Sequence, residues 1–141
     1  MMYDPFMVQP MRDELTTIGF KELTTVEQVD EAMKNARGTS LLLVNSVCGC
    51  AAGQARPGVA LALTSDVVPD NLFTVFAGQD VEATARARSY VVGYPPSSPS
   101  MAFFKDGTLI EMIERHQIEN HSAEQVASKL MEVFKQHCSK N

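Results

Sequence analysis

Hydrophobic residues recur along this chain at two spacings, one typical of helices and one typical of buried strands. In residues 24–38, apolar side chains return at helical intervals behind a capping box of Thr25 and Gln28, which predicts a helix ending at Gly38. Residues 41–45, LLLVN, form a short run that is hydrophobic on both faces, as in a central strand of a covered sheet. The pattern therefore predicts a helix followed by a buried strand.

The middle of the chain continues this alternation. Residues 51–64 are rich in helix formers, but Pro57 and Gly58 predict a kinked or interrupted helix. Residues 72–78, LFTVFAG, predict a second buried strand, and a polar helix is expected over residues 80–88. Each of the two buried strands is thus expected to lead into a helix.

The last third combines a loop, a hairpin and a helix. Residues 93–100, GYPPSSPS, are dense in Pro and Ser and predict a loop. Residues 101–116 hold two β-rich runs on either side of Asp106-Gly107, a strong signal for two adjacent antiparallel strands. A capping box that begins at Ser122 precedes an amphipathic stretch, which predicts a C-terminal helix.

The N-terminal segment adds two further elements. Residues 11–20, MRDELTTIGF, predict a helix that ends at Gly19. Residues 20–23, FKEL, predict an edge strand.

Length and composition favour one cytoplasmic domain. A chain of 141 residues with 45% hydrophobic positions can bury one core, so a single domain over residues 1–141 is expected. The start carries no basic leader or cleavage pattern, and no apolar run approaches the ~18 residues that span a bilayer. The net charge is −5 and the basic residues are scattered, so neither a membrane nor nucleic acid is an expected partner.

Two of the three cysteines, Cys48 and Cys50, stand one residue apart where the strand at 41–45 ends. A cysteine at a helix N-terminus faces unpaired backbone N–H groups and the positive end of the helix dipole, which stabilise its thiolate. Cys48 is therefore the predicted nucleophile, and Cys50, further into the helix, the predicted resolving thiol. Gly49 is expected to let the backbone bend without a side chain blocking either sulfur.

Other interpretations of the cysteines remain open. The pair can be buried apolar side chains without chemistry, because free cysteine is among the most buried residue types. It can also bind a metal, although structural zinc uses four ligands and no other Cys or His cluster has ligand spacing. Cys138, near the end of the last predicted helix, is interpreted as an incidental thiol.

Several separated motifs resemble one known family. The order βαβα, proline loop, hairpin and terminal helix resembles the thioredoxin fold, in which a cis proline precedes an apolar strand and a Lys-Asn/Asp-Gly turn. Here Pro99 precedes SMAFFKDG in that register, although thioredoxins carry Cys-x-x-Cys and this chain carries Cys48-Gly49-Cys50. That motif, with PMRDELT..GF.EL, PSSPS and ERHQIE, is similar to the bacilliredoxins, small thioredoxin-like proteins of Gram-positive bacteria that use the thiol bacillithiol.

The resemblance implies an α/β, thioredoxin-like fold with a central mixed β-sheet flanked by helices and an N-terminal extension. It implies a thiol-disulfide oxidoreductase that reduces bacillithiol mixed disulfides on client proteins, with Cys48 attacking and Cys50 resolving. The expected partners are S-bacillithiolated proteins and a low-molecular-weight thiol, and no cofactor is expected besides bacillithiol as co-substrate. A general protein disulfide isomerase, or a non-catalytic thiol-metal or redox-sensing module, is the alternative.

Candidate substrate contacts lie on both sides of the cysteines. Gly49 lies between them, and Arg56, one or two turns beyond, has a guanidinium that can pair with a bacillithiol carboxylate or is simply solvated. The resemblance places Ser98 where backbone hydrogen-bonds a substrate strand, next to Pro99 in an expected cis bond. His116 is predicted on the second hairpin strand, as a structural residue or as a site candidate included in the resemblance.

Overall fold

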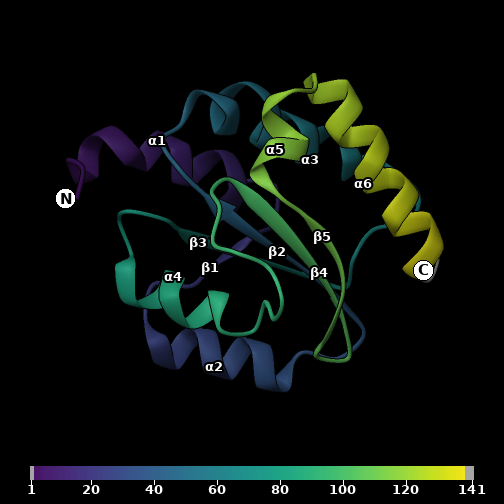
Figure 1. Cartoon of the computed structure of the whole chain (residues 1–141), viewed down its shortest axis with the longest axis horizontal. Helices are drawn as coiled ribbons and strands as arrows, with labels where there is room; N and C mark the ends of the chain where they lie inside the picture. The colour runs from purple at the N-terminus through teal and green to yellow at the C-terminus, as the bar shows by residue number, and fades with distance from the viewer. Residues whose placement is uncertain (1, 139–141) are drawn as a thin grey trace.

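The computed structural model describes residues 2–138 of the chain (Figure 1). The helices are α1 (Pro5–Thr16), α2 (Val26–Asn35), the π-helical turn η1 (Ala51–Ala55), α3 (Arg56–Ala62), α4 (Val81–Arg88), α5 (Arg115–Glu119) and α6 (Ala123–His137). The strands are β1 (Lys21–Glu22), β2 (Thr39–Asn45), β3 (Asn71–Phe76), β4 (Ser100–Lys105) and β5 (Thr108–Ile113). No helix in this described part of the chain is long and apolar enough to span a bilayer.

The strands form one mixed sheet in the order β1-β3-β2-β4-β5. β3 runs parallel to both β1 and β2, while β4 runs antiparallel to β2 and to β5. Every residue of β2 is buried, as the run of apolar residues on both faces predicts for a central strand. The predicted central mixed sheet flanked by helices is therefore confirmed, and β1 is the edge strand expected at residues 20–23.

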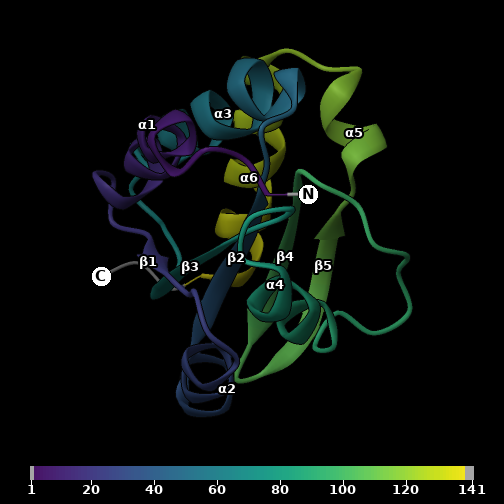
Figure 2. The ribbon, with the colours of Figure 1, turned by 90° about the vertical axis from the view of Figure 1, so that its left-hand side faces the viewer.

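Successive side chains of β2 point to opposite faces and divide the core into two layers. Leu41 and Leu43 pack with apolar residues of α1, α3 and α6, whereas Leu42 and Val44 pack with apolar residues of α2 and α4. Figures 1 and 2 show these two groups of helices on opposite sides of the sheet. The carboxyl end of β2 therefore emerges between the two layers, where the Cys-Gly-Cys segment begins.

Glycine at position 58 permits close packing between α3 and α6 behind the cysteines. A Cβ at Gly58 would lie 2.7 Å from Cγ1 of Val126 on α6 and 3.1 Å from the carbonyl oxygen of Ala123. Only a residue without a side chain fits this approach of α3 to α6. The predicted interruption of the helix at 51–64 takes the form of η1 followed directly by α3.

Two predicted boundaries are wrong. The first helix begins at Pro5 rather than at residue 11, because Asp4 caps it by accepting a hydrogen bond from Phe6 N–H and proline suits the first turn. The second hairpin strand ends at Ile113, so His116 lies on α5 instead of on a strand. Glu114 stops the strand by forming a capping box with Gln117 at the start of α5.

The two turns predicted around the last strands are confirmed. Asp106 and Gly107 have φ values of 49° and 84°, the left-handed conformations that a tight hairpin turn of the Asp-Gly type requires. The Ser98-Pro99 peptide bond is cis and leads directly into β4. The hairpin turn was expected from the Asp-Gly pair itself, whereas the cis bond was expected from the resemblance to thioredoxins.

Candidate active site

Cys48 lies at the point where β2 gives way to helix. Its N–H donates to Oγ of Ser46 at 3.2 Å, and its carbonyl oxygen accepts from Ala51 N–H at 3.0 Å and Ala52 N–H at 3.3 Å. These contacts place Cys48 directly before the helical segment that begins at Gly49 and continues into η1. The predicted placement of this cysteine at a helix start is confirmed.

The two thiols of the motif are in direct contact. Sγ of Cys48 lies 2.6 Å from Sγ of Cys50 and accepts a hydrogen bond of 3.3 Å from Cys50 N–H. Burial opposes ionisation of Cys48, but hydrogen bonds from the Cys50 thiol and from the N–H groups of Cys50 and Ala51 outweigh it. With the charge of Arg115 in addition, they lower the pKa of Cys48 below that of an ordinary thiol.

Cys50 is perturbed in the opposite direction. Its burial disfavours the thiolate, and the neighbouring Cys48 sulfur disfavours a second negative charge, which together raise the pKa of Cys50 to about 11. The pair therefore shares one favoured arrangement, with the negative charge on Cys48 and the proton on Cys50. This asymmetry suits Cys48 to nucleophilic attack.

Gly49 leaves open surface beside the sulfurs. Its φ is outside the left-handed region, and a Cβ built on it would meet no other atom within 4 Å. The backbone conformation thus does not require glycine, contrary to the bend that we expected. What agrees with the expectation is that no side chain covers the sulfurs at this position.

Arg56 is buried and fastens the segment before Cys48. Its side chain is 3% exposed, and Nη1 donates to Oδ1 of Asn45 at 2.9 Å and to the carbonyl oxygen of Ser46 at 3.0 Å. Its Nε lies 3.1 Å from Oε2 of Glu14, at ion-pair distance but without hydrogen-bond geometry. The interpretation of Arg56 as a solvated residue is wrong, and its buried guanidinium is not open to a carboxylate of a substrate.

An open groove of about 480 Å³ adjoins Cys48. Ser98 lines it from the loop that carries the cis bond, and Arg88 and Arg115 line it from α4 and α5. Nη1 of Arg115 donates to the carbonyl oxygen of Ser98 at 3.3 Å, which joins α5 to the loop. The structure thus brings Ser98, next to Pro99, to the same groove as Cys48, as expected.

His116 lies apart from this groove. Its imidazole is 68% exposed, with Nε2 3.3 Å from Oε2 of Glu114, and it is not among the residues that line the groove. The neighbouring Arg115 occupies the position beside Cys48 instead. Sequence reasoning selected the correct motif, ERHQIE, but the wrong member of it, and no local signal pointed to Arg88 at the end of α4.

Metal ligands do not gather around the thiols. Within residues 2–138, no group of three or more His, Cys, Asp or Glu side chains is arranged to hold a metal ion. Two thiols are in contact at this site, and the guanidinium groups of Arg88 and Arg115 line the adjoining groove.

Comparison with known proteins agrees with this geometry. The model of the family described as "Disulphide isomerase" matches residues 3–138. The chain is 55% identical over 132 residues to a bacilliredoxin of Bacillus cereus, covering 94% of this chain and 91% of that protein. It is 50% identical over 137 residues to a bacilliredoxin of Koribacter versatilis, covering 97% of this chain and 94% of that protein.

Solved structures of thioredoxins share the fold at low sequence identity. Thioredoxin O2 of Arabidopsis thaliana in the oxidised state superposes with a TM-score of 0.59 at 17% identity, covering 84% of this chain and 96% of that one. Mitochondrial thioredoxin 3 of Saccharomyces cerevisiae gives 0.57 at 18% identity, covering 87% and 98%. With its Cys-Gly-Cys pair where β2 leads into the following helix of this thioredoxin fold, the chain belongs to the bacilliredoxin family of thiol-disulfide oxidoreductases.

Proposed function

We propose that this protein removes bacillithiol from S-bacillithiolated cysteines of cytoplasmic client proteins. The observation that carries the proposal is the asymmetry of two touching thiols, with a lowered pKa at Cys48 and a raised pKa at Cys50, beside an open groove. A thiolate with a protonated neighbour is the arrangement that thiol-disulfide exchange needs for attack followed by resolution.

In the first step, the Cys48 thiolate attacks the bacillithiol sulfur of the mixed disulfide. A new S–S bond forms between Cys48 and bacillithiol, the old S–S bond breaks, and the client sulfur leaves as a thiolate that takes up a proton. No net oxidation occurs, because one disulfide replaces another. Ser98, next to Pro99, lines the groove beside Cys48, and Gly49 carries no side chain that would cover the attacking sulfur.

In the second step, Cys50 loses its proton and attacks Sγ of Cys48. Bacillithiol leaves as a thiolate, and an intramolecular disulfide forms between the two cysteines, whose sulfurs lie 2.6 Å apart before reaction. Two electrons from an external thiol reductant then return the pair to the dithiol. Bacillithiol acts as a co-substrate throughout, and no cofactor takes part.

Intact-mass measurement of variants in which one cysteine at a time is replaced by alanine tests this assignment. After incubation with a bacillithiolated client, Cys48→Ala is expected to release no free client. Cys50→Ala is expected to release one equivalent and to retain a bacillithiol adduct on Cys48, because the resolving thiol is gone. Cys138→Ala provides the control, since its thiol lies away from the groove, and is expected to behave like the wild type.

The opposite pattern of adducts would reverse the two roles. An adduct on Cys50 in Cys48→Ala, with none on Cys48 in Cys50→Ala, would make Cys50 the nucleophile. No adduct in either variant would overturn the proposal and leave burial or metal binding as the better interpretation of the pair.

A second candidate function is general disulfide isomerisation or oxidoreduction. The proximity of the two sulfurs favours it, because a dithiol that closes readily can also exchange with disulfides between client cysteines. Refolding of a scrambled disulfide protein without any small thiol separates the two functions. Recovery of native pairing at a rate comparable to removal of bacillithiol would favour the isomerase.

A further inference from the structure

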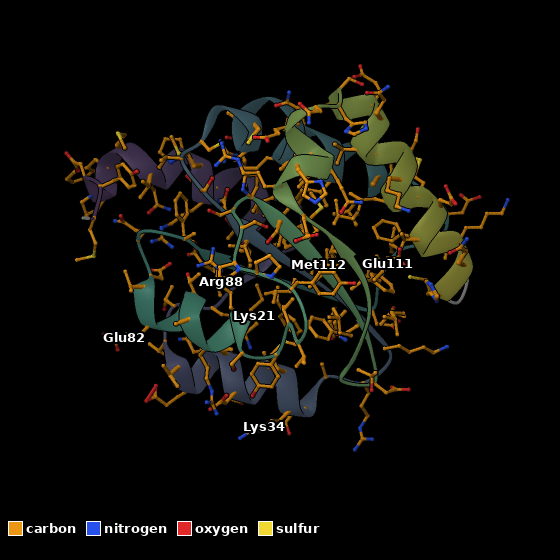
Figure 3. The ribbon with its side chains drawn as sticks, viewed as in Figure 1. Lys21, Lys34, Glu82, Arg88, Glu111 and Met112 are labelled. Carbon is orange, nitrogen blue, oxygen red and sulfur yellow. The ribbon has the colours of Figure 1, made fainter. Side chains whose placement is uncertain are left out.

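Arg88 presents an unpaired charge to the groove beside Cys48. Arg88 is the last residue of α4 and is labelled in Figure 3. Its side chain is half-buried, and within residues 2–138 its one hydrogen bond runs from Nη2 to the carbonyl oxygen of Ser97, at 3.3 Å. Its Nε is buried and has no hydrogen-bond partner. Among residues 2–138, no carboxylate lies within ion-pair distance of this guanidinium, although a half-buried cation is normally paired.

Arg115 places a second guanidinium on the same groove from α5. Its Nε is paired with Oε2 of Glu119 at 2.9 Å, and Nη1 donates to the carbonyl oxygen of Ser98. Its side chain is nevertheless 47% exposed, and its charge acts on both sulfurs. None of the described residues that line the groove is acidic, so Glu119 holds Arg115 from outside it.

We propose that Arg88 and Arg115 form an anion subsite that binds carboxylates on the small-thiol half of the mixed disulfide. The inference rests on the proposed function, because it concerns the molecule that is transferred to Cys48. A guanidinium binds a carboxylate through two parallel N–H donors, and two guanidinium groups around one groove favour a thiol with more than one carboxylate. The subsite replaces Arg56 as the source of positive charge for the substrate.

The small thiol, rather than the client, is the half that occupies this groove. After transfer, its sulfur is bonded to Cys48, so its remaining atoms must lie in the space around that sulfur. The groove of about 480 Å³ falls in the size range of small-molecule sites. The client leaves in the same step, and its carboxylates therefore have no fixed position near the two arginines.

Transfer rates from one client carrying different small thiols test the subsite. The probes are a single-cysteine client blocked with mercaptosuccinate, which carries two carboxylates, or with the neutral 2-mercaptoethanol. Appearance of the adduct on Cys48 is followed by intact mass with the Cys50→Ala protein, and each rate is divided by the rate with dithiothreitol. This division removes the intrinsic difference in reactivity between the two mixed disulfides.

We expect the normalised rate to favour mercaptosuccinate, and Arg88→Gln or Arg115→Gln to reduce this preference about three- to tenfold each. Arg88→Lys is expected to keep part of it, and raising the salt concentration to weaken it. Arg37→Gln is the matched control, because it removes the same charge from an exposed position at the opposite end of β2, and it should leave the preference unchanged.

Three results would overturn the inference. The first is an equal normalised rate for both probes in the Cys50→Ala protein that keeps both arginines. The second is a preference for mercaptosuccinate that remains unchanged in both glutamine variants. The third is an equal slowing of both probes by the glutamine variants, which would assign the arginines to the client or to the loop. If neither probe yields an adduct on Cys48, the proposed function itself fails. If Arg88→Gln does not fold, Arg115→Gln and the salt series decide.

Discussion

The charge asymmetry of the two thiols predicts how fast each one is alkylated at neutral pH. With a pKa of about 11, Cys50 carries a thiolate in about one molecule in 10⁴ at pH 7. Because the pKa of Cys48 lies below the ordinary thiol value of 9.0, its thiolate fraction exceeds about 1% at that pH. The structure thus predicts that thiolate at Cys48 outnumbers thiolate at Cys50 by at least about 100-fold.

The rate ratio is smaller than the population ratio, because a thiolate of higher pKa is a better nucleophile. With a Brønsted slope of ~0.4–0.5, a difference of two pKa units makes the Cys50 thiolate roughly 8 times more reactive than the Cys48 thiolate. A pulse of iodoacetamide at pH 7, followed by mass analysis of each cysteine peptide, should therefore label Cys48 at least about tenfold faster than Cys50. The Cys48 rate should rise with pH until its own pKa is passed and then level off.

The same experiment on Cys50→Ala tests the cause of the shift. The Cys50 thiol makes the largest favourable contribution to the Cys48 thiolate, so its removal should raise the pKa of Cys48 and shift the pH profile upwards. The backbone N–H groups of positions 50 and 51 remain as donors. Equal labelling of Cys48 and Cys50 at pH 7, or a profile that Cys50→Ala leaves unmoved, would refute the electrostatic assignment.

Two further predictions concern the packing that holds the site, both measured by urea unfolding. Arg56→Met should lower the free energy of unfolding by about 2–4 kcal/mol, because it leaves the Ser46 carbonyl oxygen without a hydrogen-bond donor. Glu14→Gln should lower it by less than about 1 kcal/mol, because Glu14 is half-exposed. Equal effects would contradict a buried anchor. Gly58→Ala should cost about 1–3 kcal/mol through its clash with Val126, and adding Val126→Ala should recover part of that loss. A neutral Gly58→Ala would show that α3 and α6 separate freely.

Elements with local signals could be predicted from the sequence alone. The helix over 26–35 begins at an N-cap, Thr25, that accepts from Gln28 N–H, the helix over 123–137 begins at a capping box, and the hairpin turns at an Asp-Gly pair. A few adjacent residues therefore determine each of them. These features depend on neighbouring residues and therefore appear in the sequence before any tertiary contact is known. The cis Ser98-Pro99 bond, in contrast, was expected from the resemblance to thioredoxins, because most X-Pro bonds in folded proteins are trans.

The two wrong boundaries arose where the local signal is unusual. Glutamate is not a preferred N-cap, yet Glu114 and Gln117 form a reciprocal capping box at the start of α5. The sequence therefore gave no signal that the second hairpin strand ends at Ile113. At the N-terminus, the helix predicted over residues 11–20 begins earlier, at Pro5, and contains Pro10, a residue that usually interrupts helix interiors. His116 was a site candidate because of the resemblance, whereas on α5 it is the neighbouring Arg115 that lines the groove.

Arg56 is buried, and not solvated as one interpretation had it, because of the π-helical turn that follows the cysteines. In η1, Arg56 N–H bonds to the carbonyl oxygen of Ala51, five residues back, so Arg56 comes to lie over Ala51, and both side chains are buried. An uninterrupted α-helix would have placed residue 55 there, and sequence composition does not reveal the extra residue. The arginine expected to meet substrate instead ties β2 to the helix behind Cys48. On the proposed function, the negative charge of the small thiol would therefore be bound by Arg88 and Arg115, the basic residues that line the groove.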